Sequence, residues 1–237
     1  MINVIILAAG VGSRLRPITN SVPKCMVPIN NVPLIERLVN QLNSSEKEIK
    51  INIVVGYKSE VVVNHFKNSD VNIILNDVYE TTNNMYSFYL ATQSITDLSD
   101  MVVINADCIY EDEIIEKCLN STKSCVMADP LFFNEEAMKI EVENNLVKGI
   151  SKTYSKTNTT FTSIDMYRFV GAESTNMILY VEEVIKGGEL NSWTEVAIDA
   201  IVKKEAVKME PLFIDTYKWY EIDNHTDLEI ASKLFSK

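Results

Sequence analysis

The feature that most constrains this chain is an apolar run that leads directly into a loop rich in glycine and proline. Residues 2–8, INVIILA, carry no charged side chain and are rich in β-branched residues, which is typical of a strand buried on both faces of a parallel sheet. Residues 9–32 then contain two glycines and three prolines, a composition that predicts a loop. Because ligands of open α/β sheets bind outside the carboxyl ends of the strands, this loop is the first candidate for a binding site.

Strands and helices are expected to alternate along the first half of the chain. Apolar periodicity predicts helices at 34–42, 59–67 and 84–95, and strands at 51–55, 71–75 and 101–106. Pro33 suits the first position of the first helix. This order predicts an α/β fold with a mostly parallel central sheet and helices on both faces.

The pattern changes after about residue 130. We expect antiparallel strands at 138–143, 146–151 and 161–169, helices at 174–186 and 193–204, a strand at 218–222 and a C-terminal helix. Asn224 is the expected N-cap of that last helix, with Asp227 three residues on. Because the sequence contains no repeat, charge block or linker, we expect one domain over residues 1–237 with a small antiparallel insertion at about 130–170.

Charge and cysteine content exclude several classes of protein. The chain holds 22 basic and 33 acidic residues, a formal net charge of −11, and a surface of that sign repels nucleic acid. Residues 1–35 nevertheless carry three basic residues and no acidic one, which indicates a local anion site. The four cysteines lack metal-binding spacing, which predicts a reduced, cytoplasmic protein without disulfides or structural zinc. The first apolar run is too short to cross a membrane, so no membrane association is expected.

The loop carries residue types that bind phosphate. Residues 8–12, AAGVG, are mostly alanine and glycine, so backbone N–H groups there can approach phosphate oxygens closely. Arg14 and Lys24 can add charge-assisted contacts. The dinucleotide fingerprint G-x-G-x-x-G is broken at Leu15, and the G-x-x-x-x-G-K-[ST] phosphate loop is absent. An ordinary βα turn, with glycine for geometry and arginine for solvation, is the alternative for a bare G-x-G.

A longer string decides between these alternatives. Residues 7–24, LAAGVGSRLRPITNSVPK, resemble the LAAGxGxRLxPxTxxxPK segment of the sugar-nucleotide pyrophosphorylase and cytidylyltransferase superfamily at every fixed position. The resemblance implies a Rossmann-like nucleotidyltransferase fold whose loop wraps a nucleoside triphosphate. Arg14 and Lys24 would be the catalytic residues, on the departing pyrophosphate and on the reacting phosphates respectively. The expected nucleotide-binding residues are Leu7, Ala8, Ala9, Gly10, Gly12, Ser13, Arg14, Lys24, Asn83, Asn84, Ser87 and Ala106.

Two carboxylates are expected to hold Mg²⁺, which normally neutralises the phosphates in nucleotidyl transfer. Asp107 follows the predicted strand 101–106, and a carboxylate at the end of a central strand is a suitable donor. The segment WYEIDNHTDLEIA offers Glu221 and Asp223 and looks like the superfamily's EID-x-x-x-DL segment, whose aspartate joins the strand-end aspartate on the metal. Asp223 is therefore preferred to Glu221. Each acid on its own could equally be a helix cap or part of a solvated turn.

Residues 76–90 narrow the choice of nucleotide. Sugar-specific members usually have a stretch rich in glycine and alanine here, whereas this chain reads NDVYETTNNMYSFYL. It looks like the NNxYS segment of small bacterial CTP:phosphocholine cytidylyltransferases and of relatives that act on aminoethylphosphonate or phosphoglutamine. Asparagine amides both donate and accept, as the Watson–Crick edge of cytosine requires. Asn83 and Asn84 could also cap the helix that begins near 84, and capping does not exclude base contact.

The acceptor is less constrained. An aromatic cage would bind a quaternary ammonium, but residues 130–170 contain no tryptophan, unlike the phosphocholine enzymes, which puts choline in doubt. A primary amine or an amino acid would instead need a carboxylate or a base, and Asp165 stands in the otherwise apolar stretch TSIDMY. Lys139 could meet an acceptor carboxylate or phosphate, or be a solvated surface lysine. The expected acceptor contacts are Asp129, Lys139, Asp165, Trp193, Glu195 and Glu221.

We therefore expect a magnesium-dependent cytidylyltransferase that transfers CMP from CTP to a small phosphorylated or phosphonate acceptor and releases pyrophosphate. Such an activity would supply a precursor of a cell-surface polysaccharide, a phospholipid or a phosphonate. The alternatives are a sugar-1-phosphate nucleotidyltransferase, which shares the loop and the metal acids and differs at residues 83–87, and a non-catalytic nucleotide-binding module, which would be free to lose those acids. The sequence leaves open whether the protein forms a homodimer.

Overall fold

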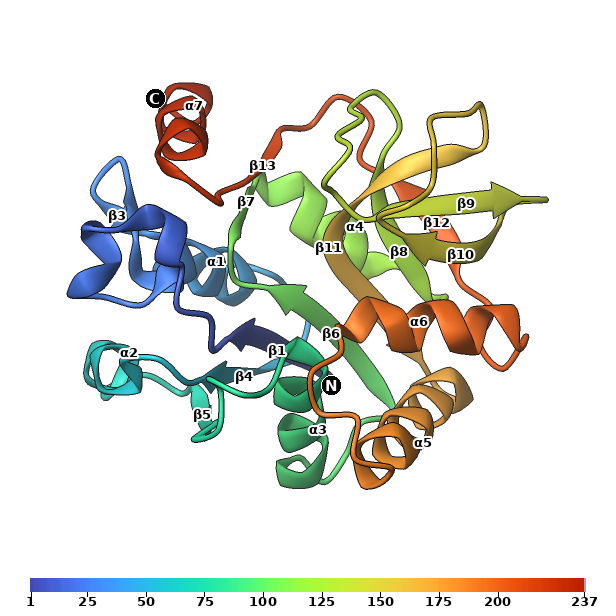
Figure 1. Cartoon of the computed structure of the whole chain (residues 1–237), viewed down its shortest axis with the longest axis horizontal. Helices are drawn as coiled ribbons and strands as arrows, with labels where there is room; N and C mark the ends of the chain where they lie inside the picture. Colours follow the sequence, from blue (N-terminus) through green and yellow to red (C-terminus); the bar gives the residue numbers. More distant parts are fainter. Residues whose placement is uncertain (237) are drawn as a thin grey trace.

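The central sheet confirms the predicted α/β class. A computed structural model describes residues 1–236 and shows one nine-stranded sheet with helices on both faces (Figure 1). Its main path runs β10-β9-β11-β6-β1-β4-β5. In addition, β8 pairs with β11, and β12 pairs with β8. The pairs β1–β4, β1–β6, β4–β5 and β8–β12 are parallel, whereas β11 and β9 pair only antiparallel.

The elements follow in chain order. The first half contains β1 (Ile2–Ala8), β2 (Pro28–Ile29), β3 (Val32–Pro33), α1 (Leu34–Asn43), β4 (Ile49–Val55), α2 (Ser59–Phe66), β5 (Asn72–Leu75), α3 (Asn84–Ser94) and β6 (Asp100–Asn105). The second half contains β7 (Cys108–Tyr110), α4 (Asp112–Asn120), β8 (Cys125–Asp129), β9 (Lys139–Glu143), β10 (Leu146–Ser151), β11 (Thr160–Val170), α5 (Ala172–Lys186), α6 (Thr194–Lys203), β12 (Glu210–Phe213), β13 (Trp219–Glu221) and α7 (His225–Leu234).

The residues of β1 explain why the sheet is covered on both faces. All seven are buried, and successive side chains point to opposite faces. Val4 and Ile6 pack in a cluster with apolar residues of α1, α2 and α4, whereas Ile5 and Leu7 pack in a second cluster with α3, α5 and α6. The strand therefore lies between two apolar cores, as its unbroken apolar run predicts.

Several details differ from the expectation. Residues 9–32 contain three short 3₁₀ turns and the β2–β3 hairpin, so this loop is a structured one. Pro33 belongs to β3 and is the N-cap of α1, not its first helical residue, and α1 begins at Leu34, where the predicted range 34–42 begins. The sequence did not predict β7, α4, β8 or β12. The three antiparallel strands expected after residue 130 are β9, β10 and β11, and residues 130–138 form no strand.

The four cysteines are buried and none is in a disulfide within residues 1–236. None of the helices described there is both long enough and apolar enough to span a bilayer.

Candidate active site

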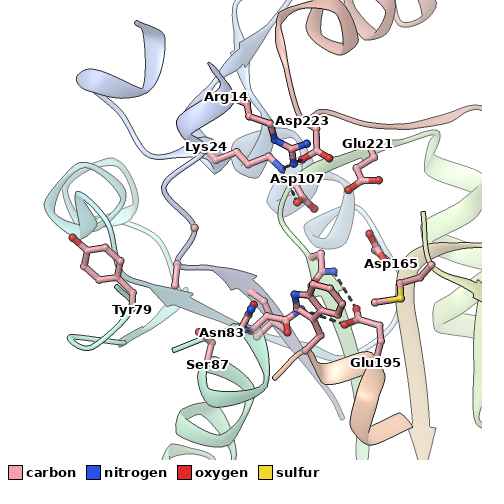
Figure 2. A pocket seen from close by; sticks show the side chains of 18 of the residues that line it. Arg14, Lys24, Tyr79, Asn83, Ser87, Asp107, Asp165, Glu195, Glu221 and Asp223 are labelled. Atoms are coloured by element: carbon pink, nitrogen blue, oxygen red, sulfur yellow. Dashed lines mark hydrogen bonds and ion pairs between the residues drawn. The ribbon is translucent and has the colours of Figure 1, made fainter. Parts of the chain in front are cut away.

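A cavity of about 450 Å³ opens at the carboxyl ends of β1 and β6, directly beside the glycine-containing loop. It brings together segments that are distant in the sequence, namely the loop after β1, residues 76–87, the turn after β6, residues 136–138, the middle of β11, the start of α6 and the residues around β13 (Figure 2). This is the position that open α/β sheets use for ligands. Of the expected nucleotide-binding residues, the cavity is lined by Leu7, Ala9, Gly10, Gly12, Ser13, Arg14, Lys24, Asn83, Asn84 and Ser87.

The loop after β1 is shaped to bring Lys24 into this cavity. Gly12 has φ +66, and a Cβ there would lie 2.8 Å from Cβ of Lys24, so a side chain at this position would displace the lysine. Thr19 donates a hydrogen bond to the carbonyl of Gly12 at 2.8 Å, and Tyr57 donates one to the carbonyl of Thr19 at 2.9 Å. A Cβ on Gly10, by contrast, would meet no protein atom within 4 Å. The backbone at Gly10 is therefore open to a ligand.

The expected catalytic cations and metal acids form one ion-pair network. Lys24 Nζ lies 2.8 Å from Oδ2 of Asp107 and 2.8 Å from Oδ1 of Asp223, and Arg14 Nη2 lies 2.8 Å from the same Asp223 oxygen. Figure 2 shows the two cations and the two carboxylates converging at one end of the cavity. Asp107 reaches this point from the turn after β6, and Asp223 from the segment between β13 and α7.

The network shifts the ionisation of its members. Burial alone would lower the pKa of Lys24, but the carboxylates of Asp107 and Asp223 outweigh it and raise that pKa well above its ordinary value. Burial would raise the pKa of Asp223, yet the ammonium of Lys24 and the guanidinium of Arg14 lower it. Burial, with Asp107 and Asp223 nearby, raises the pKa of Glu221 to about 7. The pKa shifts of Lys24 and Asp223 therefore favour the charged form of both side chains at neutral pH.

The donor set here fits a magnesium ion. Asp107, Glu221 and Asp223 each offer a carboxylate oxygen, and these oxygens lie within 4.8 Å of one another. Oxygen-only ligands are those that Mg²⁺ prefers. The ammonium of Lys24 already occupies a position between two of the three acids, so the geometry between these carboxylates accepts a cation.

A capping box at the start of α7 holds Asp223 in place. Asn224 accepts a hydrogen bond from the N–H of Asp227, as expected of the N-cap, and Asp227 Oδ2 accepts from the N–H of Asn224. The same carboxylate oxygen also accepts the backbone N–H of Asp223 at 2.9 Å. The cap of this helix therefore fixes the backbone that carries one of the metal acids.

The asparagines of residues 76–87 line the opposite end of the cavity. Asn83 is the N-cap of α3, and its Oδ1 accepts the N–H of Asn84. Asn84 Oδ1 accepts the N–H of Thr194 at 2.8 Å, and its Nδ2 lies 3.4 Å from Glu195. Asn76, buried beneath them, donates to the hydroxyl of Ser87 at 3.1 Å. Asn83 therefore caps α3, Asn84 connects α3 to the start of α6, and both residues also line the cavity.

Carboxylates form the third part of the cavity wall. Asp165 in β11, Glu195 in α6 and Glu221 in β13 all line it, as does Trp193. The hydroxyl of Tyr167 lies 3.2 Å from Asp165 Oδ1 and 3.1 Å from Glu195 Oε1. Burial, together with the neighbouring carboxylates, raises the pKa of Asp165 well above its ordinary value, and burial likewise raises the pKa of Glu195.

Four expected site residues lie elsewhere. The side chain of Lys139 is fully buried and donates to the carbonyls of Asn134 and Glu135, the latter at 2.7 Å, so it anchors the preceding loop and is neither an acceptor contact nor a surface lysine. Asp129 accepts the N–H groups of Leu131 and Phe132 and Nε1 of Trp219, which gives it a structural role beside a second cavity. Ala8 and Ala106 are buried and do not line the main cavity.

That second cavity adjoins the first. It has a volume of about 600 Å³ and shares Arg14, Glu136, Ala137, Lys152, Glu221 and Asp223 with the main cavity. Phe132 and Trp219 pack edge to face on its wall, with ring centroids 5.9 Å apart. The main cavity is also lined by Asn76, Tyr79, Asn105 and Lys152, which were not among the predicted site residues. Of these, Asn105 could have been recognised from its position at the end of β6.

The comparisons with known proteins agree with this geometry. Residues 3–128 match the family model described as nucleotidyl transferase. The chain is 26% identical to the CTP:phosphoglutamine cytidylyltransferase of Campylobacter jejuni over 257 aligned residues, which cover 96% of this chain and 98% of that protein. It is 29% identical over 146 residues to the bifunctional protein GlmU of Methanococcus aeolicus, covering 61% of this chain but only about a third (34%) of that longer relative.

The solved structure of CTP:phosphocholine cytidylyltransferase from Streptococcus pneumoniae superposes with a TM-score of 0.78 at 23% identity and covers 99% of both chains. At that identity the superposition shows a shared fold. Because the family model spans more than half of the chain and includes both the loop after β1 and Asp107, the chain belongs to the nucleotidyl transferase family.

Proposed function

We propose that this protein is a cytidylyltransferase that transfers CMP from CTP to a small phosphorylated or phosphonate acceptor and releases pyrophosphate. The observation that carries the proposal is the convergence of Arg14, Lys24, Asp107 and Asp223 at one end of the cavity, beside the open backbone of Gly10. Two cations and two carboxylates in contact are what the transfer of a charged nucleotidyl group between phosphates requires.

The choice of CTP rests on two further points. Asn83 and Ser87 lie at the end of the cavity opposite the charged network (Figure 2), and Asn84, the residue after Asn83, also lines the cavity. Their amide and hydroxyl groups suit the donors and acceptors of a cytosine edge. The C. jejuni relative aligned over nearly its whole length is named as a CTP-dependent cytidylyltransferase. Both points favour CTP over the nucleotides of the sugar-specific branch.

The residues divide the chemical work as follows. An acceptor phosphate is already ionised at neutral pH, so its oxygen can attack the α-phosphorus of CTP without a general base. The new P–O bond forms as the bond between the α-phosphorus and the bridging oxygen breaks, and pyrophosphate leaves with that electron pair. Lys24 and Arg14, which neutralise Asp223 in this structure, are within reach of the cavity and would stabilise the phosphate oxygens in turn.

We propose Mg²⁺ as the cofactor, held by Asp107 and Asp223 with Glu221 adjacent. When bound, it would neutralise negative charge on the α-phosphate and on the leaving pyrophosphate. Lys24, which contacts both carboxylates in this structure, would then be free to contact the phosphates.

The test is pyrophosphate release from purified protein with each of CTP, UTP and dTTP, with Mg²⁺ or EDTA. The acceptor panel contains phosphocholine, 2-aminoethyl phosphate, 2-aminoethylphosphonate, phosphoglutamine and glucose 1-phosphate. We expect release with CTP and a non-sugar acceptor, and only with the metal. Release from UTP or dTTP with glucose 1-phosphate, and none from any CTP pair, would establish the sugar-specific alternative instead.

A further inference from the structure

The acidic wall of the cavity contrasts in charge with the phosphate end. Asp165, Glu195 and Glu221 line it, and within residues 1–236 neither Asp165 nor Glu195 forms an ion pair with a basic side chain. Burying carboxylates without a counter-ion is unfavourable. This wall is therefore suited to a cationic group that arrives with a ligand.

Asp165 is the member of this wall best placed to receive such a group. Its Oδ1 accepts from Tyr167, but no hydrogen bond in the described part of the chain uses its other carboxylate oxygen. Figure 2 shows the carboxylate facing the cavity between Glu221 and Glu195. Glu195, only 2% exposed, is already contacted by Tyr167, Asn84 and Asn105. A free carboxylate oxygen can only accept hydrogen bonds, so it favours a cation that carries N–H groups.

The backbone at Asp165 has a conformation that few residues other than glycine adopt. Asp165 has φ +58 in the middle of β11, and the pairing of β11 with β8 shifts register between Ser163 and Tyr167. Positive φ is uncommon outside glycine, although aspartate and asparagine tolerate it better than most residues. This geometry turns the Asp165 side chain into the cavity from a strand that otherwise packs in the core.

The aromatic contribution to the cavity points the same way. A quaternary ammonium has no N–H group and depends on aromatic faces. Trp193 is the tryptophan on the wall, and the ammonium of Lys152 already lies 4.9 Å from its ring centroid. Tyr79, the other aromatic residue that lines this cavity within residues 1–236, lies on the side away from Asp165 (Figure 2). With one face of Trp193 covered by a cation of the chain itself, the acidic wall offers a quaternary ammonium little aromatic surface.

From these observations we propose that Asp165 is a specificity-determining residue that selects acceptors bearing a primary ammonium, whose N–H groups bond to its free carboxylate oxygen. The proposal rests on the proposed transfer of CMP to a phosphorylated acceptor and narrows the acceptor class. The phosphate of such an acceptor would lie toward Lys24 and Asp107, and its ammonium toward Asp165 and Glu195.

A methylation series tests the proposal. Kinetic constants are measured with CTP and 2-aminoethyl phosphate, its N-methyl, N,N-dimethyl and N,N,N-trimethyl derivatives (the last is phosphocholine), and ethyl phosphate as the uncharged analogue. The four ammonium groups carry three, two, one and no N–H. We expect kcat/KM to fall along this series and to be lowest for phosphocholine and ethyl phosphate. Equal or higher kcat/KM with phosphocholine would overturn the proposal.

Asp165→Asn supplies the residue-level test. Asparagine keeps the size, tolerates positive φ and can still accept from Tyr167, but it removes the charge. We expect kcat/KM with 2-aminoethyl phosphate to fall about 10- to 150-fold, as for loss of a hydrogen bond to a charged group, and the loss with ethyl phosphate to be much smaller. Glu113→Gln, at an exposed acid of α4 outside both cavities, is the matched control and should leave both values unchanged.

The outcomes separate the two levels of inference. An equal loss of kcat/KM with the charged and the uncharged acceptors would overturn the proposal. It would show that Asp165 acts on the metal or on the fold, because its carboxylate also lies within 4.8 Å of ligand atoms of Asp107 and Cys108. Should Asp165→Asn fail to fold, the methylation series on the unaltered protein still decides. Absence of CMP transfer from CTP to every phosphorylated acceptor would refute the proposed function itself.

Discussion

Lys24 is the residue whose replacement should have opposite effects on metal binding and on catalysis. Its ammonium is the counter-ion of two partly buried carboxylates, at 2.8 Å from each. Lys24→Met preserves the length of the side chain and removes the charge. Asp107 and Asp223 then face each other without the ammonium between them, and of the two only Asp223 keeps a cation within residues 1–236, Arg14.

The size of the effect follows from the geometry. The carboxylate oxygens lie within 4.8 Å of each other, and two like charges at that distance repel by about 3.5 kcal/mol at an effective dielectric constant of about 20. Both side chains are about a quarter exposed (27% and 26%), so solvent reduces this to about 1–3 kcal/mol. For a domain of this size, that corresponds to a melting temperature lower by about 2–12 °C.

Magnesium should reverse this loss of stability in the variant. A divalent cation between the two carboxylates replaces the missing ammonium, and ligands that bind only the native state stabilise it. We therefore expect Mg²⁺ to raise the melting temperature of Lys24→Met by more than that of the unaltered protein, where it must displace Lys24. Turnover should nevertheless fall by about 10²–10³-fold, as for loss of one positioned charge in a transition state.

The assay is thermal unfolding across a Mg²⁺ titration without nucleotide, paired with steady-state pyrophosphate release. Arg16→Met is the control, because it removes a cation from the same loop whose side chain makes no ion pair in the described part of the chain. If Mg²⁺ stabilised Lys24→Met no more than Arg16→Met, the carboxylates would not be the metal site. Turnover within tenfold of normal would refute the role of Lys24 in transfer.

Three further predictions concern the acids of the site. Asp107→Ala should reduce pyrophosphate release below detection and leave the circular dichroism spectrum intact, because Lys24 keeps Asp223 as a partner; near-normal rates would show that Asp107 does not hold the metal. Asp165→Asn should raise the melting temperature in metal-free buffer at pH 7, because a carboxyl whose folded pKa is raised destabilises the fold above its unfolded pKa of about 4. Melting curves should show that this gain shrinks toward zero as the pH falls to about 4. A gain that does not change with pH would contradict the pKa argument. Asp227→Ala should lower kcat/KM more than Asn224→Ala, because only Asp227 also accepts the backbone N–H of Asp223. Each substitution should cost about 1 kcal/mol in urea unfolding. Equal effects of the two substitutions on kcat/KM would show that the cap does not position Asp223.

The parts of the fold that the sequence predicts best are those where local pattern and burial agree. The apolar residues of β1 alternate between two cores, and the N-cap at Asn224 is a local hydrogen-bond pattern, so both can be recognised without tertiary information. By contrast, β7 was not predicted, because a strand of three residues leaves no periodicity to detect. Its partner β13, residues 219–221, lies within the predicted strand 218–222, but the pairing of the two strands is a tertiary contact that the sequence does not show. The strand β8 was missed although it is buried, because a run of five residues does not distinguish strand from helix.

The candidate site divides in the same way. Lys24, Asp107 and Asp223 lie in motifs with fixed spacing, and the structure brings all three into contact. The misassignment of Lys139 has a different origin, because a lysine in a strand is usually solvated, and only the fold of residues 134–135 over it provides the carbonyls that bury it. The pairing of Lys152 with the ring of Trp193 likewise depends on how β10 and α6 meet.

The Lys24 contacts also determine how this protein should lose activity. They join residues 83 and 199 positions apart, so the site exists only while the segment preceding α7 remains docked, and α7 itself buries only Ala231 completely. An element with so little buried apolar surface opens locally at a lower free energy than the central sheet. Catalysis should therefore disappear at urea concentrations that leave the sheet intact. In such a titration, turnover reports the detachment of the segment preceding α7, and circular dichroism reports global unfolding.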